Sequence, residues 1–199
     1  MLKFICMLSL LYLVNFANAQ QTQRHKLTLE EYDAQIQASS KCLKRNTYSV
    51  DKRRLMFPFK GATKVSIISF RDTTSFMVSR IPIKDAVLDS GLVLEEKVLT
   101  QKEVDQLTDL IFNYGFKTKI KYRLITNFQC YDPHNGILFY DENKHVNNFI
   151  EICFDCQKFR SNVEKLNLGE NCTEKFTLLK SFFLKNGVTK LSSEDIYTK

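Results

Sequence analysis

The chain has 199 residues, of which 44% are hydrophobic and 12% are aromatic, and its formal net charge is +7. This hydrophobic content excludes a disordered chain, and the length predicts one domain with a substantial core. The moderate positive charge favours weak contact with anionic surfaces, but it specifies no partner.

The first 19 residues predict a secretory signal peptide. Lys3 supplies a basic start, an apolar run follows it, and the segment Ala17-Asn18-Ala19 has the small-x-small form of a cleavage site. The alternative is an uncleaved membrane helix, but the apolar run is short, and no later segment reaches the ~20 apolar residues that span a bilayer. We therefore expect export to the periplasm or the extracellular space, with no transmembrane segment after the signal peptide.

Residues 20–60 predict a helix and a basic connector. Thr28 and Glu31 have the spacing of a capping box, which favours a helix that begins there. The stretch DKRRLMFPFK, which follows, is basic and interrupted by proline, and we interpret it as a connector. The sequence leaves open whether this helix docks on the rest of the chain. Residues 61–199 are expected to form a single α+β domain.

Both strands and helices are predicted in residues 61–199. TKVSIISFR predicts a strand, with a turn at residues 72–74 and a return strand through SFMVSRIPI. LTQKEVDQLTDLIFNYGF predicts a helix, in which Thr100 and Glu103 form a capping box and Gly115 caps the C-terminal end. TEKFTLLKSFFLKNG predicts a last helix that ends at Gly187.

A basic strip alternates with apolar residues in FKTKIKYRL. The alternation predicts a strand with one face toward the core and one face carrying the cations Lys117, Lys119, Lys121 and Arg123. We interpret this face as an ordinary solvated surface, because charges of one sign also discourage edge aggregation. The alternative is a surface for weak contact with anionic partners. The sequence contains no specific nucleic-acid signal.

A β-hairpin is predicted in the stretch GILFYDENKHVNNFIEICF, whose two apolar runs flank a turn-prone polar segment. With a two-residue turn at Glu142-Asn143, Asp132 lies opposite Cys153. Cys130 then lies beside both Cys153 and Cys156, although it is distant from them in sequence.

Alternation within this hairpin separates its core residues from the rest. Ile150, Ile152 and Phe154 are predicted to point together into the core. Glu151 is predicted to point to the opposite face, so we expect its replacement to cost far less stability than that of Ile152.

The same segment resembles an uncharacterised family of small exported bacterial proteins. The shared pattern is a Cys-x-x-Pro segment followed by a basic residue, an ILFYD-like strand and an ICFxC strand end. In this chain the matching positions are Cys130, Pro133, His134, Ile152, Cys153, Phe154 and Cys156. The resemblance extends from Thr100 to Gly187. It implies a shared architecture and no assigned activity.

Five cysteines remain once Cys6 leaves with the signal peptide. They are Cys42, Cys130, Cys153, Cys156 and Cys172. In an oxidising compartment an odd number indicates two disulfides and a spare thiol, or a metal site. Counting alone does not identify the spare cysteine.

Three interpretations of these cysteines stay open. Disulfides such as Cys130–Cys156 are preferred, because they suit an exported protein. A zinc site would use Cys130, Cys153, Cys156 and Cys172, with His134 as a substitute ligand. A redox-active Cys153–Cys156 pair is less favoured, because its first thiol lies at a strand end near Glu151 and Asp155 rather than at a helix N-terminus.

The sequence as a whole predicts an α+β fold, with an antiparallel sheet of about five or six strands and two or three helices mainly on one face. We expect an exported, cysteine-stabilised domain that is a binding or structural protein rather than an enzyme. We assign it no catalytic residue and no cofactor. The alternative is a thiol-redox or zinc-dependent enzyme centred on Cys153 and Cys156.

Overall fold

The structure is a computed structural model that describes residues 27–71, 81–116, 131–163, 166 and 168–197. The described residues before Gln35 belong to one compact unit, and those from Gln35 onward belong to a second, larger unit. Among the described residues, no helix is both long enough and apolar enough to span a bilayer.

The described part of the chain combines helices with antiparallel strands. The helices are α2 (Leu29–Ser40), α3 (Val50–Arg54), α4 (Gln101–Asn113), α5 (Glu174–Lys185) and α6 (Ser193–Tyr197). The strands are β1 (Cys42–Lys44), β2 (Lys64–Phe70), β3 (Ile83–Lys84), β4 (Val87–Leu88), β5 (Val93–Val98), β6 (Tyr114–Phe116), β7 (Asn135–Tyr140), β8 (Val146–Cys153) and β9 (Lys158–Ser161). The predicted α+β fold is confirmed.

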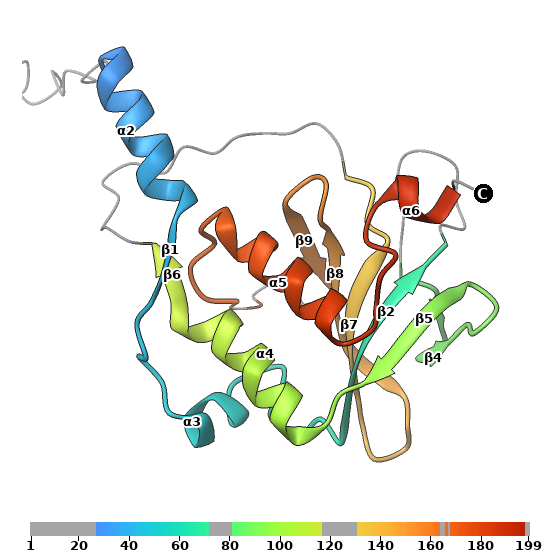
Figure 1. Cartoon of the computed structure of the whole chain (residues 1–199). Coiled ribbons are helices and arrows are strands. Elements are labelled where there is room, and N and C mark those ends of the chain that lie inside the picture. Colours follow the sequence, from blue (N-terminus) through green and yellow to red (C-terminus); the bar gives the residue numbers. More distant parts are fainter. Residues whose placement is uncertain (1–26, 72–80, 117–130, 164–165, 167, 198–199) are drawn as a thin grey trace, which may run out of the picture. The chain divides into compact units, whose positions relative to one another are not determined.

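The main sheet has five antiparallel strands in the order β5-β2-β7-β8-β9 (Figure 1). Two smaller sheets pair β1 with β6 and β3 with β4. In the main sheet, neighbours β2 and β7 are far apart in sequence, so the centre of the sheet depends on long-range pairing.

One face of the main sheet packs against α4 and α5 (Figure 1). Leu107 of α4 and Phe183 of α5 are fully buried there, against Ile67, Ile150 and Ile152 of the strands. Burial of each such side chain contributes ~1.5–3 kcal/mol relative to exposure. The prediction that Ile150 and Ile152 point into the core is therefore confirmed.

The opposite face of the sheet is also covered. Ile68, Phe70 and Leu138 are fully buried on it, and Ile83 and Leu88 of the β3–β4 hairpin pack against this second cluster. The sheet therefore differs from a one-sided antiparallel sheet, in which one face meets water.

The ends of α4 show one correct prediction and one wrong one. Thr100 and Glu103 form the predicted capping box, in which the backbone N–H of Thr100 donates to Glu103 Oε2 at 2.6 Å. Gly115, however, does not cap the helix, because the chain passes directly from Asn113 into β6. Gly115 instead lies in a strand, opposite Leu43.

The predicted β7–β8 hairpin is confirmed, but its register is two residues from the predicted one. Asn135 pairs with Ile152, so the position opposite Cys153 belongs to His134 rather than Asp132. The connection is wider than a two-residue turn, because Tyr140 pairs with Val146 next to a register shift and Lys144 has a φ of 63°. A wider loop with one left-handed residue shifts every pair that follows.

Two further predictions concern the connections around β2. The predicted turn at residues 72–74, and most of the return strand after it, lie outside the described residues; within them, β2 pairs with β5 and β7. The stretch interpreted as a connector contains α3, whose Arg53 is buried and donates to the backbone oxygen of Tyr48 at 2.7 Å. Arg54 pairs with Asp105 of α4, so this segment is docked on α4.

Candidate functional site

Two disulfides are present among the described residues. Cys42 is bonded to Cys172 with a Cα–Cα distance of 5.5 Å and a sequence separation of 130. Cys153 is bonded to Cys156 with a Cα–Cα distance of 5.2 Å and a separation of 3. The suggested Cys130–Cys156 pair is therefore wrong, because Cys156 is bonded to its near neighbour. Cys130 itself lies outside the described residues.

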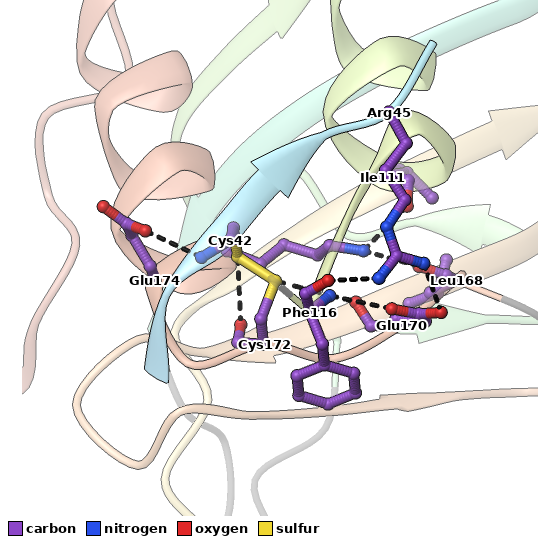
Figure 2. Close-up of a disulfide and its surroundings, with 9 residues drawn as sticks. Cys42, Arg45, Ile111, Phe116, Leu168, Glu170, Cys172 and Glu174 are labelled. Carbon is purple, nitrogen blue, oxygen red and sulfur yellow. Dashed lines mark hydrogen bonds and ion pairs between the residues drawn. A yellow bond between two sulfur atoms is a disulfide. The ribbon is translucent and has the colours of Figure 1, made fainter. Parts of the chain in front are cut away.

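The Cys42–Cys172 disulfide joins β1 to the residues just before α5 (Figure 2). β1 pairs with β6, which places Cys42 opposite Phe116. The backbone N–H of Cys42 donates to Glu174 Oε2 at 2.8 Å, and Cys172 is fully buried. The first turn of α5 is thus attached to β1 by one covalent bond and one charge-assisted hydrogen bond.

Glu170 lies beside this disulfide, and its carboxylate accepts a hydrogen bond from the backbone of β6 (Figure 2). Its Oε2 accepts from the backbone N–H of Phe116 at 2.7 Å, and its Oε1 pairs with Nη1 of Arg45 at 2.9 Å. A Cβ at Gly115 would lie 2.5 Å from Oε2 of Glu170, closer than real Cβ contacts allow. Gly115 therefore allows the close approach of this carboxylate, which would have to shift if a Cβ were present, and does not act as a helix cap.

Lys175 is a buried cation in the first turn of α5, with 3% of its surface exposed. Its Nζ donates to the backbone oxygen of Ile111 at 2.8 Å and to that of Leu168 at 3.2 Å. The oxygen of Ile111 belongs to the last turn of α4, where a cation complements the helix dipole. Burial lowers the pKa of Lys175 to about 8, although the charge of Glu170 acts in the opposite direction.

A small cavity borders Lys175 between the helices and the sheet. Its volume is about 20 Å³, enough for roughly one water molecule. Ile137, Ile152 and Phe176 line it together with other apolar side chains, and Lys175 is its one charged neighbour among the described residues. A cavity of this size excludes an organic ligand, so we interpret Lys175 as a structural cap of α4.

The Cys153–Cys156 disulfide closes the turn between β8 and β9. Residues 154–157 form the turn, in which Gln157 has a φ of 50°, and Cys153 pairs with Lys158 where the strands resume. The backbone N–H of Cys156 donates to Sγ of Cys153 at 3.1 Å. Phe154 points to the core, with its ring centroid 5.3 Å from that of Phe183.

A buried polar cluster lies beside this turn, on the sheet face away from α4 and α5. Glu151 accepts from the backbone N–H of Ile81 at 2.8 Å and from the hydroxyl of Tyr131 at 3.0 Å. Arg160 lies opposite Glu151 on β9, and its guanidinium carbon is 3.9 Å from the ring centroid of Tyr131. Burial, together with the charge of Glu151, raises the pKa of Tyr131.

Glu151 therefore corrects one expectation drawn from strand alternation. It does point away from Ile152, but it is buried because the second face of the sheet is covered. Replacing it would leave the backbone N–H of Ile81 without this acceptor, which costs ~1–3 kcal/mol for a buried group.

His134 lies next in this cluster, with 2% of its surface exposed. Its Nε2 is 3.1 Å from Oδ2 of Asp132, and the same oxygen accepts from the hydroxyl of Ser193 at 2.8 Å. Its ring packs edge-on against that of Tyr197. Nδ1 of His134 is buried and has no hydrogen-bond partner among the described residues.

A separate groove lies near the start of α4, with a volume of about 390 Å³. This volume falls within the ~300–1,000 Å³ of small-molecule sites. Its walls combine polar and apolar groups; Phe59, Val98 and Val104 are among the apolar ones, and the cations Arg54 and Lys64 also line it. Each cation also pairs with a carboxylate on a neighbouring element, Arg54 with Asp105 and Lys64 with Glu96.

The predicted site residues are thus distributed over different places. Cys153 and Cys156 are together, whereas Cys172 is bonded to Cys42, so a four-thiolate zinc site would require that disulfide to open. In the part of the chain that the structure describes, no three His, Cys, Asp or Glu side chains gather to hold a metal ion. The basic strip Lys117, Lys119, Lys121 and Arg123 lies outside the described residues and stays a prediction.

Sequence reasoning missed the partner of Cys172 and the role of Lys175. The odd number of cysteines was the one sequence signal that Cys42 could take part in a disulfide. It did not identify Cys172 as the partner, because no spacing rule links cysteines this far apart in sequence. Comparison with protein-family models, with curated proteins and with solved structures found no match. The resemblance to small exported bacterial proteins therefore stays a prediction.

Proposed function

We propose that this protein is an exported, disulfide-stabilised domain whose main role is to bind a ligand. The observation that carries export is the Cys42–Cys172 disulfide, which joins distant segments inside the folded unit. Such bonds persist in oxidising compartments, which agrees with the signal-peptide pattern of residues 1–19.

Cell fractionation with disulfide mapping tests the export. We expect a mature chain that starts near Gln20, in the periplasmic or extracellular fraction, with Cys42 and Cys172 in one non-reduced peptide pair. A full-length chain that stays in the cytoplasm with both thiols free to alkylate would contradict the proposal.

The groove at the start of α4 supports the binding role. It offers apolar groups at Phe59 and Val98 and cations that also line it, which suits a small molecule with an apolar body and an anionic end. Aliphatic carboxylates of increasing chain length are suitable probes, because the apolar contact grows with each methylene group.

Thermal-shift measurements with these carboxylates test the groove. We expect the melting temperature of the wild type to rise with chain length, and Ala62→Phe to remove the effect, because Ala62 lines the groove. Val87→Phe is the matched control, since Val87 is exposed on β4 and does not line the groove. An equal shift in Ala62→Phe would contradict binding at this place.

A further inference from the structure

The Cys153–Cys156 disulfide contributes little to holding the strands that it joins. β8 and β9 already pair from Ile150 to Cys153 without it, and the bond spans a separation of only 3 residues. A bond that closes so short a loop removes little entropy from the unfolded chain. The fold alone therefore does not account for this pair of cysteines.

Cys153 lies in a row of side chains that crosses four strands on the second face of the sheet. Lys158 of β9 pairs directly with Cys153. On the other side, His134 lies one residue beyond the last pair of the β7–β8 ladder, so it occupies the position opposite Cys153, with Cβ atoms roughly 5 Å apart. Phe70 of β2 continues the row, since its backbone N–H donates to the oxygen of His134 at 2.9 Å.

This row provides what a thiolate at Cys153 needs. Lys158 contributes a cation, His134 an imidazole, and the backbone N–H of Cys156 already donates to Sγ of Cys153 at 3.1 Å. The buried Nδ1 of His134 has no hydrogen-bond partner among the described residues while the disulfide is closed, and Nε2 faces Asp132, so Nδ1 is the nitrogen that can accept a proton.

The remaining charged groups near Cys153 are engaged elsewhere or lie on the surface. Glu151 accepts from Ile81 and Tyr131, and Arg160 stacks on Tyr131. Asp132 holds Nε2 of His134 and accepts from Ser193. Asp155 is exposed in the turn.

We propose that Cys153–Cys156 is a reversible disulfide centre that oxidises dithiols, with His134 as the proton acceptor paired to Cys153. Both cysteines are 2% exposed, so exchange requires the turn at residues 154–157 to open. The substrate class is therefore a small dithiol or a cysteine pair in an unfolded, flexible chain. Asp132 is a positioning residue, because it acts through its contact with Nε2 of His134.

One thiolate of the substrate attacks Sγ of Cys156, which forms a mixed disulfide and breaks the bond to Cys153. Cys153 leaves as a thiolate, and the proton lost by the attacking thiol goes to Nδ1 of His134, which gives an imidazolium–thiolate pair. The second substrate thiol then attacks the mixed disulfide and passes its proton to Cys156. Two electrons and two protons move from substrate to protein.

A dithiothreitol titration of the folded, mature wild type, followed by alkylation and peptide mapping, tests the centre. We expect Cys153 and Cys156 to become labelled at concentrations about tenfold below those that label Cys42 and Cys172, with the circular dichroism unchanged. Oxidised dithiothreitol should restore the bond. Opening of both disulfides in one step, or loss of the fold with the first, would overturn the proposal.

The pH dependence of Cys153 alkylation in the partly reduced protein tests the role of His134. We expect the midpoint of the pH dependence of Cys153 alkylation to rise by about one unit in His134→Gln. At pH values below both midpoints, Cys153 of the variant should then be alkylated about tenfold more slowly than that of the wild type. His145→Gln is the matched control, since His145 is half-exposed in the β7–β8 loop, and its midpoint should equal the wild type. An unchanged midpoint in His134→Gln would overturn the pairing. If that variant does not fold, the dithiothreitol titration of the wild type still tests whether Cys153–Cys156 is a reversible disulfide. Lys158→Gln should then raise the midpoint of Cys153 alkylation, as expected for His134→Gln.

Discussion

The two disulfides should differ strongly in what they contribute to stability. On the chain-entropy model, closing a loop with a separation of 130 stabilises the folded state by ~5 kcal/mol, whereas a separation of 3 gives ~2 kcal/mol. We therefore expect the double variant Cys42→Ala/Cys172→Ala to lose about 5 kcal/mol of unfolding free energy. Cys153→Ala/Cys156→Ala is the matched control and should lose about 2 kcal/mol or less.

Guanidinium denaturation followed by circular dichroism measures both losses. For a chain of this size we take a slope of ~5 kcal/mol per molar, so the first variant should unfold at a denaturant concentration about 1 M lower than the wild type. Alanine is chosen over serine because Cys172 is fully buried and a hydroxyl there would add a desolvation cost. A loss in the first variant that is equal to or smaller than that in the second would refute the assignment of Cys42–Cys172 as the stabilising bond.

Three further outcomes follow from the described contacts. The unfolding free energy of the wild type minus that of Lys175→Met should rise by ~3 kcal/mol as the pH increases from 8 toward 10.5, in pH-dependent denaturation, because the unfolded chain binds a proton that Lys175, with its pKa lowered to about 8, has lost. Ile152→Ala should cost ~2–5 kcal/mol, and Asn147→Ala, exposed on the same strand, less than ~0.5 kcal/mol, measured by urea denaturation; equal losses would contradict the facing of β8. Gly115→Ala should cost ~1–3 kcal/mol in thermal unfolding, because its Cβ would meet Glu170, and a neutral result would contradict that close approach.

Local patterns predicted the elements of this fold well. The capping boxes at Thr28 and Thr100 both form, because the side chains that make them lie within one turn of helix. The β7–β8 hairpin and its alternation were also predictable, since neighbouring residues decide which face of a strand is apolar. These features depend on interactions over a few residues.

Features that depend on distant segments were predicted less well. The hairpin register was wrong because the loop width, with Lys144 in a left-handed conformation, cannot be read from the apolar runs alone. The burial of Glu151 depends on the β3–β4 hairpin and on Tyr131, which cover the second face of the sheet. Gly115 was interpreted as a helix cap because its real constraint, the carboxylate of Glu170, comes from far along the chain.

The candidate sites show the same division. The sequence predicted that Cys153 and Cys156 would be neighbours, since their spacing is local. It did not predict His134 opposite Cys153, because that position depends on the register of the hairpin. Nor did it predict the pairing of Cys42 with Cys172, which requires β1, β6 and the start of α5 to meet.

The position of the Cys42–Cys172 bond also determines how the protein responds to mechanical force. All five strands of the main sheet lie between these two cysteines in the sequence. A pull on the chain directly before Cys42 and directly after Cys172 therefore passes through the sulfur–sulfur bond, and the sheet bears no load from it while the bond is closed. Reduction would release 130 residues into the path of the force, with a gain in contour length of roughly 430 Å. In the oxidised protein the bond is thus a short tether between residues 42 and 172, and reduction makes the sheet the element that resists extension between them.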